Sequence, residues 1–142
     1  MSEIIYTYEI SVEDYLMLRK AVCFQDISER QAKAALDNDD FLIAAKDDNK
    51  TVGMTRLVTD GAWAVLIVDV IVLPEYQGRG IGRAMIERAL RHIKNIINND
   101  EQAGVFLVAA KDKEGFYEKL GFTKRPDEIY GAGMSMWLSK QS

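Results

Sequence analysis

The hydrophobic pattern of the first sixty residues switches between strand-like and helix-like periods. Ile4–Ile10 shows the period-2 alternation that is typical of a strand. Ser11 and Ser28 stand where helix N-caps are expected, ahead of helices that run to about Val22 and Leu36. Two more strands are predicted, each bounded by turn residues, at Phe41–Ala45 and Thr51–Val58.

The middle of the chain predicts a strand, a crossover helix and a further strand. Ala62–Leu73 is almost wholly apolar, which is typical of a central strand that is covered on both faces. After Gly80, apolar residues recur at helical spacing as far as Ile97, and charged residues lie largely off that stripe. Val105–Ala110 is a second strand of the buried type. Because such crossovers are right-handed within one sheet, these two strands should be parallel.

The end of the chain predicts a short helix and an antiparallel pair of strands. The helix covers Glu114–Leu120 and is closed by Gly121, and the strands are expected at Phe122–Lys124 and Met134–Leu138. A chain of 142 residues has the length of one ordinary domain. We therefore expect a single domain over residues 1–142, of the mixed α/β (α+β) class, with a mostly antiparallel central sheet of about seven strands and about four flanking helices.

Composition and charge exclude several classes of protein. The net charge of −4 argues against nucleic acid as the main partner. The single cysteine, Cys23, excludes an internal disulfide and a zinc site built on several cysteines, and no metal is expected. The first residues lack the basic and apolar stretches of a signal peptide, and no apolar run is long enough to span a bilayer. The resulting expectation is a cytoplasmic protein without a membrane partner.

Three glycines join the central strand to the helix that follows it. They lie in the run Gln77-Gly78-Arg79-Gly80-Ile81-Gly82, which Arg83 follows. Glycine allows positive φ and a close approach of the backbone to a ligand. The start of a helix also directs unpaired N–H groups and the positive end of its dipole to one place. These features predict a site for a phosphate or pyrophosphate; the alternative is a tight turn without a ligand.

Two other phosphate-binding motifs do not fit this run. The ATP/GTP loop needs a Gly-Lys pair followed by Ser or Thr, which the chain lacks. The dinucleotide motif Gly-x-Gly-x-x-Gly, counted from Gly78, would need its third glycine at the position of Arg83. A nucleotide-binding α/β enzyme therefore has little support.

The same run matches Gln/Arg-x-x-Gly-x-Gly/Ala at every fixed position, and so resembles the acyl-CoA pyrophosphate loop of the GNAT superfamily of N-acetyltransferases. Further along, Gly115-Phe116-Tyr117-Glu118-Lys119-Leu120-Gly121-Phe122 is similar to the Phe-Tyr-x-x-x-Gly-Phe segment of that superfamily. The order of predicted elements agrees as well, and the resemblance is closest over residues 69–83 and 115–122. It implies direct transfer of an acetyl group from acetyl-CoA to a primary amine.

The resemblance also implies how acetyl-CoA is bound. Backbone N–H groups of the glycine run would hold the pyrophosphate, and the arginines beside them would donate to it, unless they are only solvated surface charges. The pantetheine would pair with the end of the central strand, where the central parallel pair splays at the CoA site. The residues assigned to acetyl-CoA are Ile71, Val72, Gln77, Gly78, Arg79, Gly80, Ile81, Gly82, Arg83, Phe116 and Tyr117.

Two residues are candidates for the acid and the base. By motif match, Tyr117 would donate a hydrogen bond to the departing thiol; the alternative is that it only packs the short helix. Asp69 interrupts the apolar central strand, where a buried carboxylate must be paired or functional, so it is either a candidate base or a structural aspartate. Many superfamily members carry a glutamate on this strand and an asparagine before the short helix. Both are missing here, so the resemblance does not supply the base, and ordered water is a further alternative.

The acceptor amine would lie, by the same resemblance, between the break after the first helix and the loop that joins the last two strands. Phe24, Tyr130 and Met134 would form an apolar wall and Asp26 or Glu128 would supply negative charge, unless these are only core and turn residues. Residues 18–28 and 131–134 faintly resemble bacterial and plastid members that act on arylalkylamines. The expected partner is therefore a small-molecule or peptide amine.

Two questions stay open at this level. A non-catalytic acyl-CoA-binding module of the same fold is the alternative to an enzyme, because the base is undetermined. Homodimers are common in the superfamily, but no feature of the sequence decides the oligomeric state. Covalent catalysis by Cys23 and His92 has little support, since each fits a structural role better.

Overall fold

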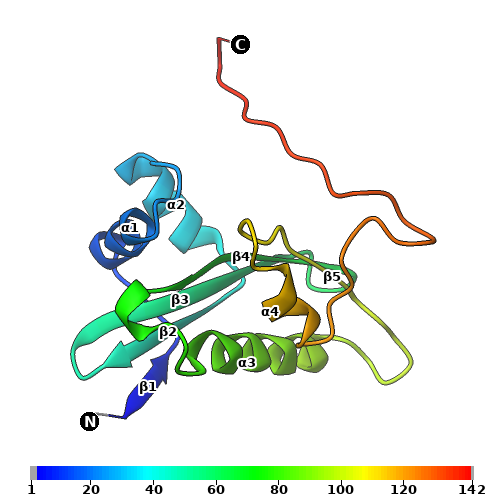
Figure 1. Cartoon of the computed structure of the whole chain (residues 1–142), viewed down its shortest axis with the longest axis horizontal. Helices are drawn as coiled ribbons and strands as arrows, with labels where there is room; N and C mark the ends of the chain where they lie inside the picture. Colours follow the sequence, from blue (N-terminus) through cyan, green and yellow to red (C-terminus); the bar gives the residue numbers. More distant parts are fainter. Residues whose placement is uncertain (1–2, 142) are drawn as a thin grey trace. The chain divides into compact units, whose positions relative to one another are not determined.

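The computed structural model describes residues 3–141 of the chain (Figure 1). The chain divides into two compact parts, one that ends at Leu107 and one that begins at Val108. The expectation that residues 1–142 form one domain stays a prediction. The first part contains β1 (Ile4–Thr7), α1 (Val12–Ala21), α2 (Glu29–Asn38), β2 (Phe41–Asp47), β3 (Lys50–Thr59), β4 (Ala64–Val72), the short 3-10 helix η1 (Pro74–Tyr76), α3 (Ile81–Ile96) and β5 (Gly104–Phe106), and the second contains α4 (Glu114–Glu118).

The first part is one open sheet with helices on both faces. Its strands lie in the order β1-β2-β3-β4-β5. Neighbouring strands are antiparallel except β4 and β5, which are parallel and are connected through α3. Figure 1 shows α1 and α2 on one side of the sheet and α3 on the other. The predicted mixed sheet, its parallel pair and, within residues 3–141, the four helices are therefore confirmed, but the pair lies at one edge of the sheet and not at its centre.

Local sequence signals start the first two helices where we expected them. The side-chain oxygen of Ser11 accepts a hydrogen bond from the N–H of Asp14 at 3.0 Å. Ser28 and Gln31 cap each other reciprocally, with hydrogen bonds of 3.0 and 2.9 Å between side chain and backbone. Each cap satisfies donors that the first turn of a helix leaves unpaired, and contributes about 1 kcal/mol.

The apolar face of α3 packs on the sheet and so places the glycine run that precedes this helix. Gly53 on β3 lets β4 and α3 pack closely against this strand. A Cβ at this position would lie 2.9 Å from the carbonyl oxygen of Ile71 and 3.3 Å from Cε of Met85. Burial of one isoleucine or methionine side chain stabilises the fold by about 1.5–3 kcal/mol. The buried residues of α3 are Ile81, Met85, Ile86, Ala89 and Ile93.

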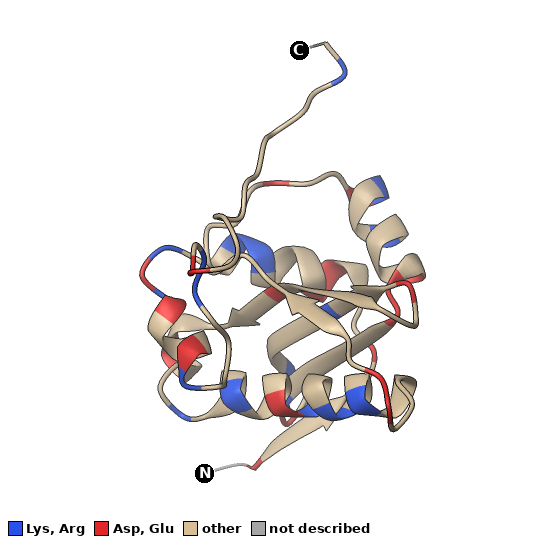
Figure 2. Cartoon of the chain, turned by 90° about the vertical axis from the view of Figure 1, so that its right-hand side faces the viewer, with Lys and Arg blue, Asp and Glu red and all other residues tan. Residues whose placement is uncertain are grey.

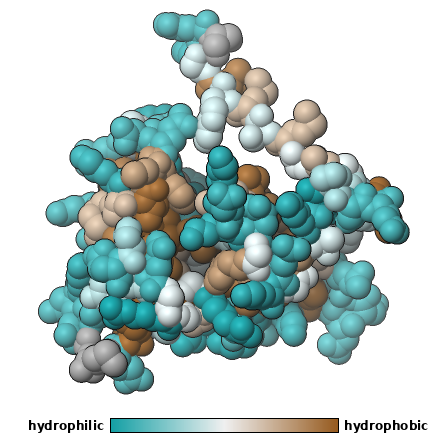
Figure 3. Space-filling model, viewed as in Figure 1, coloured by the Kyte–Doolittle hydropathy of each residue, from teal (hydrophilic) through white to brown (hydrophobic). Residues whose placement is uncertain are grey.

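The last two predicted strands are absent, so the described residues form a sheet of five strands and the prediction of about seven was wrong in this respect. Phe122–Lys124 and Met134–Leu138 carry no strand pairing. Apolar side chains lie exposed along the C-terminal segment (Figure 3), and 94% of Met134 is accessible to solvent. Alternating apolar residues favour a strand only where a neighbour accepts the backbone hydrogen bonds. Within the second part, residues 122–141 provide no such neighbour for each other.

Charged residues of both signs are interspersed along the elements of the chain (Figure 2). Among the described residues, no helix has the length and apolar character that a membrane-crossing segment requires. A search of residues 3–141 finds no group of three or more His, Cys, Asp or Glu side chains that could hold a metal ion.

Candidate active site

The second half of β4 has an open edge. β5 pairs with β4 only from Ala64 to Leu66, whereas β4 continues to Val72 and stays paired there with β3. Beyond Leu66, the side of β4 that faces β5 therefore has no strand partner in the described part of the chain. The side-chain amide of Gln77 donates to the carbonyl oxygen of Val72 at 2.9 Å, which ties the start of the glycine run to the end of this edge.

The glycine run forms a turn with free N–H groups at the start of α3. Gly78 and Gly80 have φ angles of +80° and +81°, in the left-handed region that costs other residues about 1–2 kcal/mol. A Cβ would meet nothing within 4 Å at either position, so conformation rather than space requires glycine. Within residues 3–141, no backbone N–H from Gly78 to Arg83 donates a hydrogen bond. Such a group of donors, with no acidic residue in the first helical turn, suits a phosphate.

The two arginines of this loop are exposed and held by weak local contacts. One guanidinium N–H of Arg79 donates to the carbonyl oxygen of Glu75 at 3.1 Å, and the group lies 4.8 Å from the ring centroid of Tyr76. Nε of Arg83 lies 2.6 Å from Oε1 of Glu87, one turn further along α3. Exposed pairs of this kind are worth only about 0.3–0.5 kcal/mol. Both side chains can therefore turn to an anionic ligand at little cost.

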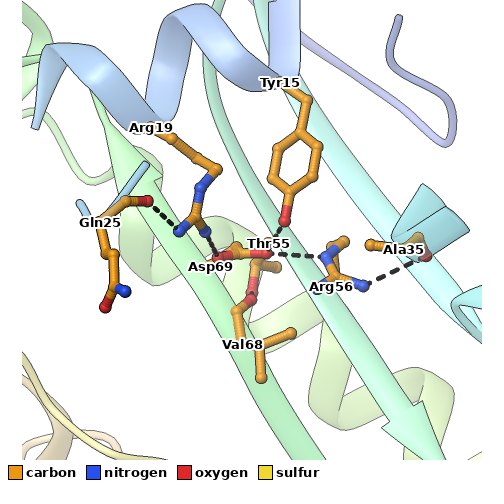
Figure 4. Close-up of polar contacts among 8 residues, drawn as sticks. All are labelled: Tyr15, Arg19, Gln25, Ala35, Thr55, Arg56, Val68 and Asp69. Carbon is orange, nitrogen blue, oxygen red and sulfur yellow. Dashed lines mark hydrogen bonds and ion pairs between the residues drawn. The ribbon is translucent and has the colours of Figure 1, made fainter. Parts of the chain in front are cut away.

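Asp69 is the centre of a buried polar network (Figure 4). Its Oδ1 accepts a hydrogen bond from Arg19 at 2.7 Å, and its Oδ2 accepts one from Nε of Arg56 at 2.8 Å and one from the hydroxyl of Tyr15. The side chains of Asp69, Arg19 and Arg56 are only 9%, 14% and 12% exposed, and Tyr15 is buried. The network joins α1 to β3 and β4.

A β-bulge presents Asp69 to this network. Arg56 on β3 is opposite Val68, and Met54 is opposite Ile71, so two residues of β4 face one residue of β3 at this point. Asp69 has a φ of 53°, an uncommon angle for a residue with a side chain, although aspartate tolerates it better than most. The bulge breaks the simple period-2 alternation along the strand. A strained residue persists only where its surroundings hold it, and here three donors do so.

The network favours the structural interpretation of Asp69 over its role as a base. A base must direct an oxygen lone pair at the substrate, but donors from Tyr15, Arg19 and Arg56 all converge on this carboxylate. Burial and the hydrogen bond to Asp69 raise the pKa of Tyr15 to about 12, so this hydroxyl remains a donor at neutral pH. Asp69 is thus arranged to hold three elements together.

The three partners of Asp69 were not predicted from the sequence, although two signals pointed to them. An aspartate in an apolar strand requires a basic or hydrogen-bonding partner. Tyr15 and Arg19 are four residues apart on α1, which places both on one face of the helix. Arg56 gives no comparable local signal, because its position opposite Val68 depends on strand register.

Tyr117 lies in α4 in an aromatic environment. Its ring makes edge contacts with Phe116, at a centroid distance of 4.9 Å, and with Phe122, at 6.0 Å. Only 8% of the residue is exposed, and this burial raises the pKa of Tyr117 to about 12. The hydroxyl therefore keeps its proton at neutral pH. It can act as a proton donor there, but not as a base. No hydrogen bond to another described residue engages this hydroxyl.

The four predicted acceptor residues are divided between the two parts of the chain. Phe24 is half-buried and Asp26 is exposed, both between α1 and α2. Tyr130 and Met134 are exposed in the second part, where the N–H of Tyr130 donates to Oδ1 of Asp127 at 2.7 Å. An acceptor site built from these four residues stays a prediction.

Cys23 and His92 have separate surroundings that fit structural roles. Cys23 is exposed just after α1. The imidazole of His92 stacks on the ring of Phe41, with the centroids 3.8 Å apart. This stacked pair also lines a cavity of about 280 Å³, which contains none of the residues assigned from the sequence. The lining residues are Tyr8, Phe41, Arg88, Arg91, His92 and Asn95.

Comparison with known proteins agrees with this architecture. A family model described as the acetyltransferase (GNAT) domain matches residues 37–124. The chain is also similar to the crystal structure of a protein of unknown function from meticillin-resistant Staphylococcus aureus, described as a probable acetyltransferase. The TM-score is 0.85 and the sequence identity is 31%, over 96% of this chain and 100% of that one.

Two relatives of known sequence carry the name N-acetyltransferase. The uncharacterized N-acetyltransferase ycf52 of Pyropia yezoensis is 34% identical over 106 residues, which cover 72% of this chain and 59% of the relative. The chloroplastic serotonin N-acetyltransferase 2 of Oryza sativa subsp. japonica is 30% identical over 124 residues, which cover 84% and 59%. This chain therefore spans only 59% of the length of each relative. The family model matches more than half of the chain, and the staphylococcal likeness extends over nearly all of it; the chain belongs to the GNAT acetyltransferase family.

Proposed function

We propose that this protein is an acetyl-CoA-dependent N-acetyltransferase that transfers the acetyl group directly to a primary amine. The observation that carries the proposal is the run of free N–H groups from Gly78 to Arg83, next to the open edge of β4. The first suits the pyrophosphate of the cofactor and the second suits its extended pantetheine arm. Acetyl-CoA supplies an activated acetyl thioester, and no metal is needed for its transfer.

The reaction makes unequal demands on acid and base. A free alkylamine has a pKa of about 10.4, so losing its proton at pH 7 costs about 4–5 kcal/mol. The departing thiol has a pKa of about 8.5 and needs little help. Tyr117, whose pKa is raised to about 12, is assigned the modest role of donating a hydrogen bond to the sulfur. Because three donors hold Asp69, we assign deprotonation of the amine to ordered water rather than to this carboxylate.

The acceptor is proposed to be a small amine with an apolar body, with a peptide N-terminus as the next candidate. Phe24 and Tyr130 are aromatic and partly accessible to solvent, and Asp26 is an exposed acid suited to attract an ammonium group. The name of the rice relative, a serotonin N-acetyltransferase, adds support for an arylalkylamine.

The second candidate function is an acyl-CoA-binding module without catalysis. One observation favours it: the carboxylate on the central strand is already occupied, so this strand supplies no free base. The two candidates share the cofactor site and differ only in whether an amine reacts there.

Release of free thiol from acetyl-CoA tests both candidates. The assay should include an arylalkylamine, a polyamine, an amino acid and a peptide N-terminus, and acetyl-CoA binding should be followed separately by thermal shift. We expect faster thiol release with at least one amine, fastest with the arylalkylamine. A thermal shift without any amine-dependent release would leave only the binding module, and the absence of both would reject both candidates.

Replacement of Tyr117 by Phe tests the acid. We expect kcat to fall about 10–100-fold, because the departing sulfur loses its hydrogen bond, while the affinity for acetyl-CoA stays the same. The matched control is Tyr8→Phe, which removes a hydroxyl from an exposed tyrosine that is assigned to neither the cofactor nor the acceptor. Equal kcat values for wild type and Tyr117→Phe would remove Tyr117 from this role.

A further inference from the structure

Arg19 contacts two places that are distant in the sequence and adjacent in the proposed reaction. Its Nη1 donates to Oδ1 of Asp69 on β4, and its Nη2 donates to the carbonyl oxygen of Gln25, both at 2.7 Å. Gln25 belongs to the segment between α1 and α2, residues 22–28, which we call the connecting segment. One planar guanidinium therefore joins this segment directly to β4 (Figure 4).

Two further contacts hold the connecting segment on Arg19. The N–H of Phe24 donates to the backbone carbonyl of Arg19 at 3.0 Å. The guanidinium carbon of Arg19 lies 5.6 Å from the centroid of the Phe24 ring, within the range of a cation–π contact. The position of Phe24, a predicted acceptor residue, thus depends on where Arg19 is held.

The other end of the link lies beside the proposed donor strand. Asp69 is in the bulge of β4, two residues before Ile71, and β4 beyond Leu66 is the open edge assigned to the pantetheine. The bulge and the charge pair make this end rigid, since Asp69 is 9% exposed and held by three donors. The side chain of Arg19 thus gives the connecting segment a direct polar link to a rigid part of β4.

We infer that Arg19 is a positioning residue that sets the connecting segment against β4, and so determines how the amine, rather than acetyl-CoA, is bound. This inference rests on the proposed function. Misplacement of a reactant by about 1 Å can cost about 100-fold in rate, so a single lost tether has a measurable effect.

Arg56 is the matched control for Arg19. It donates to the same carboxylate at 2.8 Å, its side chain is 12% rather than 14% exposed, and its guanidinium lies 5.6 rather than 5.7 Å from the ring of Tyr15. Its second hydrogen bond differs, because it goes to the carbonyl oxygen of Ala35 on α2, at 3.3 Å, and not to the connecting segment. If the two arginines only held Asp69, their replacement would have equivalent effects.

The test compares Arg19→Lys with Arg56→Lys in the full-length chain. Lysine keeps the charge but cannot span two acceptors with a planar fork. We expect both variants to lose stability to a similar degree. Arg19→Lys should raise the KM for the amine about tenfold and leave the KM for acetyl-CoA within about twofold, whereas Arg56→Lys should leave both KM values within about twofold. Equal changes in the amine KM, or a change confined to acetyl-CoA, would overturn the inference.

A second measurement does not depend on catalysis. Amide hydrogen exchange at Cys23 and Phe24, whose N–H groups donate to carbonyl oxygens of α1, should be faster in Arg19→Lys than in Arg56→Lys, compared at equal global stability. If wild-type protein acetylates no amine, the proposed function fails, and the exchange result still decides whether Arg19 positions the segment. Equal exchange rates would refute that role.

Arg19→Gln serves as the second variant if Arg19→Lys does not fold. Glutamine can donate to Asp69 or to Gln25 but does not reach both, so the same changes in the amine KM and in exchange are expected. If neither Arg19 variant folds while Arg56→Lys does, Arg19 is a core-stabilising residue and the inference is overturned.

Discussion

The glycine run and the Asp69 network are two polar regions near the same strand, and they treat hydrogen-bonding groups in opposite ways. Backbone donors from Gly78 to Arg83 have no partners within residues 3–141, and most residues of the run are exposed although Ile81 is buried. At Asp69, donors from three side chains meet on one buried carboxylate. Unused donors at the surface cost little and await a ligand, whereas buried groups must be paired because desolvation is expensive. The glycine run therefore keeps donors available for a ligand, whereas the Asp69 network uses its donors to connect α1, β3 and β4.

The largest expected effect is the loss of the carboxylate at the centre of the network. Asp69→Ala leaves Arg19 and Arg56 buried without their anion, which should lower the free energy of unfolding by about 3–5 kcal/mol. Equilibrium unfolding in urea measures this change. The control is Asp37→Ala, which removes an exposed pair with Lys33 and should cost less than about 0.5 kcal/mol. Similar costs for both variants would show that the Asp69 network stabilises the fold no more than an exposed ion pair does.

Tyr15→Phe removes a single hydroxyl from the same network. The hydrogen bond is made to a charged acceptor, so its loss should cost about 1.5–3 kcal/mol at pH 7. Urea unfolding again provides the measurement. Tyr8→Phe, at an exposed tyrosine of the same part, should leave stability nearly unchanged.

The stability of the protein should also fall at alkaline pH. The pKa of Tyr15 is raised from 10.0 to about 12 by burial and by its hydrogen bond to Asp69. A pKa that is higher in the folded state gives stability that is complete below pH 10 and is lost as the pH rises towards 12. Tyr15→Phe should therefore reduce this slope without abolishing it, because burial also raises the pKa of Tyr117 to about 12. An unchanged slope in Tyr15→Phe would contradict the assignment.

In the glycine run, a substitution should weaken acetyl-CoA binding as well as stability. Gly80→Ala forces a side chain to a φ of +81°, which costs about 1–2 kcal/mol and should weaken acetyl-CoA binding about tenfold by displacing the N–H groups. Calorimetry with acetyl-CoA and urea unfolding separate the two effects. Gly115→Ala is the control, since a Cβ there has open space and no positive φ is involved. If acetyl-CoA binds Gly80→Ala as tightly as wild type, the run is only a turn.

The smallest expected effects concern the exposed pair of Arg83 and Glu87. Arg83→Gln should weaken acetyl-CoA binding about 2–5-fold, the range for one exposed charge. Glu87→Gln frees Arg83 from its partner and should strengthen binding by up to about twofold. Calorimetry at low and high salt measures both, and the two differences should shrink at high salt. If Arg83→Gln strengthened binding and Glu87→Gln weakened it, Arg83 would make no contact with the phosphate.

Features that depend on neighbours in the chain were predictable. Ser11 and Ser28 cap helices because their side chains reach N–H groups three residues away. The glycines at 78 and 80 adopt positive φ because the turn into α3 requires it at those positions. The apolar stripe of α3 follows from helical periodicity alone. In each case the interacting groups lie within one or two turns of the backbone.

Features that depend on residues distant in the sequence were not predictable. The apolar alternation at residues 134–138 resembled a strand, but no backbone pairing realises it in residues 122–141. Asp69 was correctly recognised as an unusual residue, yet its role depends on Tyr15 and Arg19, which are 54 and 50 residues away. The bulge that turns it towards α1 appears only in the register between β3 and β4.

The sequence by itself determined the course of the backbone through the glycine run, because glycine conformation and helix capping are local properties of a few residues. The tertiary structure alone decided that Asp69 is an anchor, and that Arg19 connects it to the connecting segment. A buried carboxylate is held or free according to which donors the fold brings within about 3 Å of it. That distance is set by strand register and helix packing, which depend on residues far apart in the sequence.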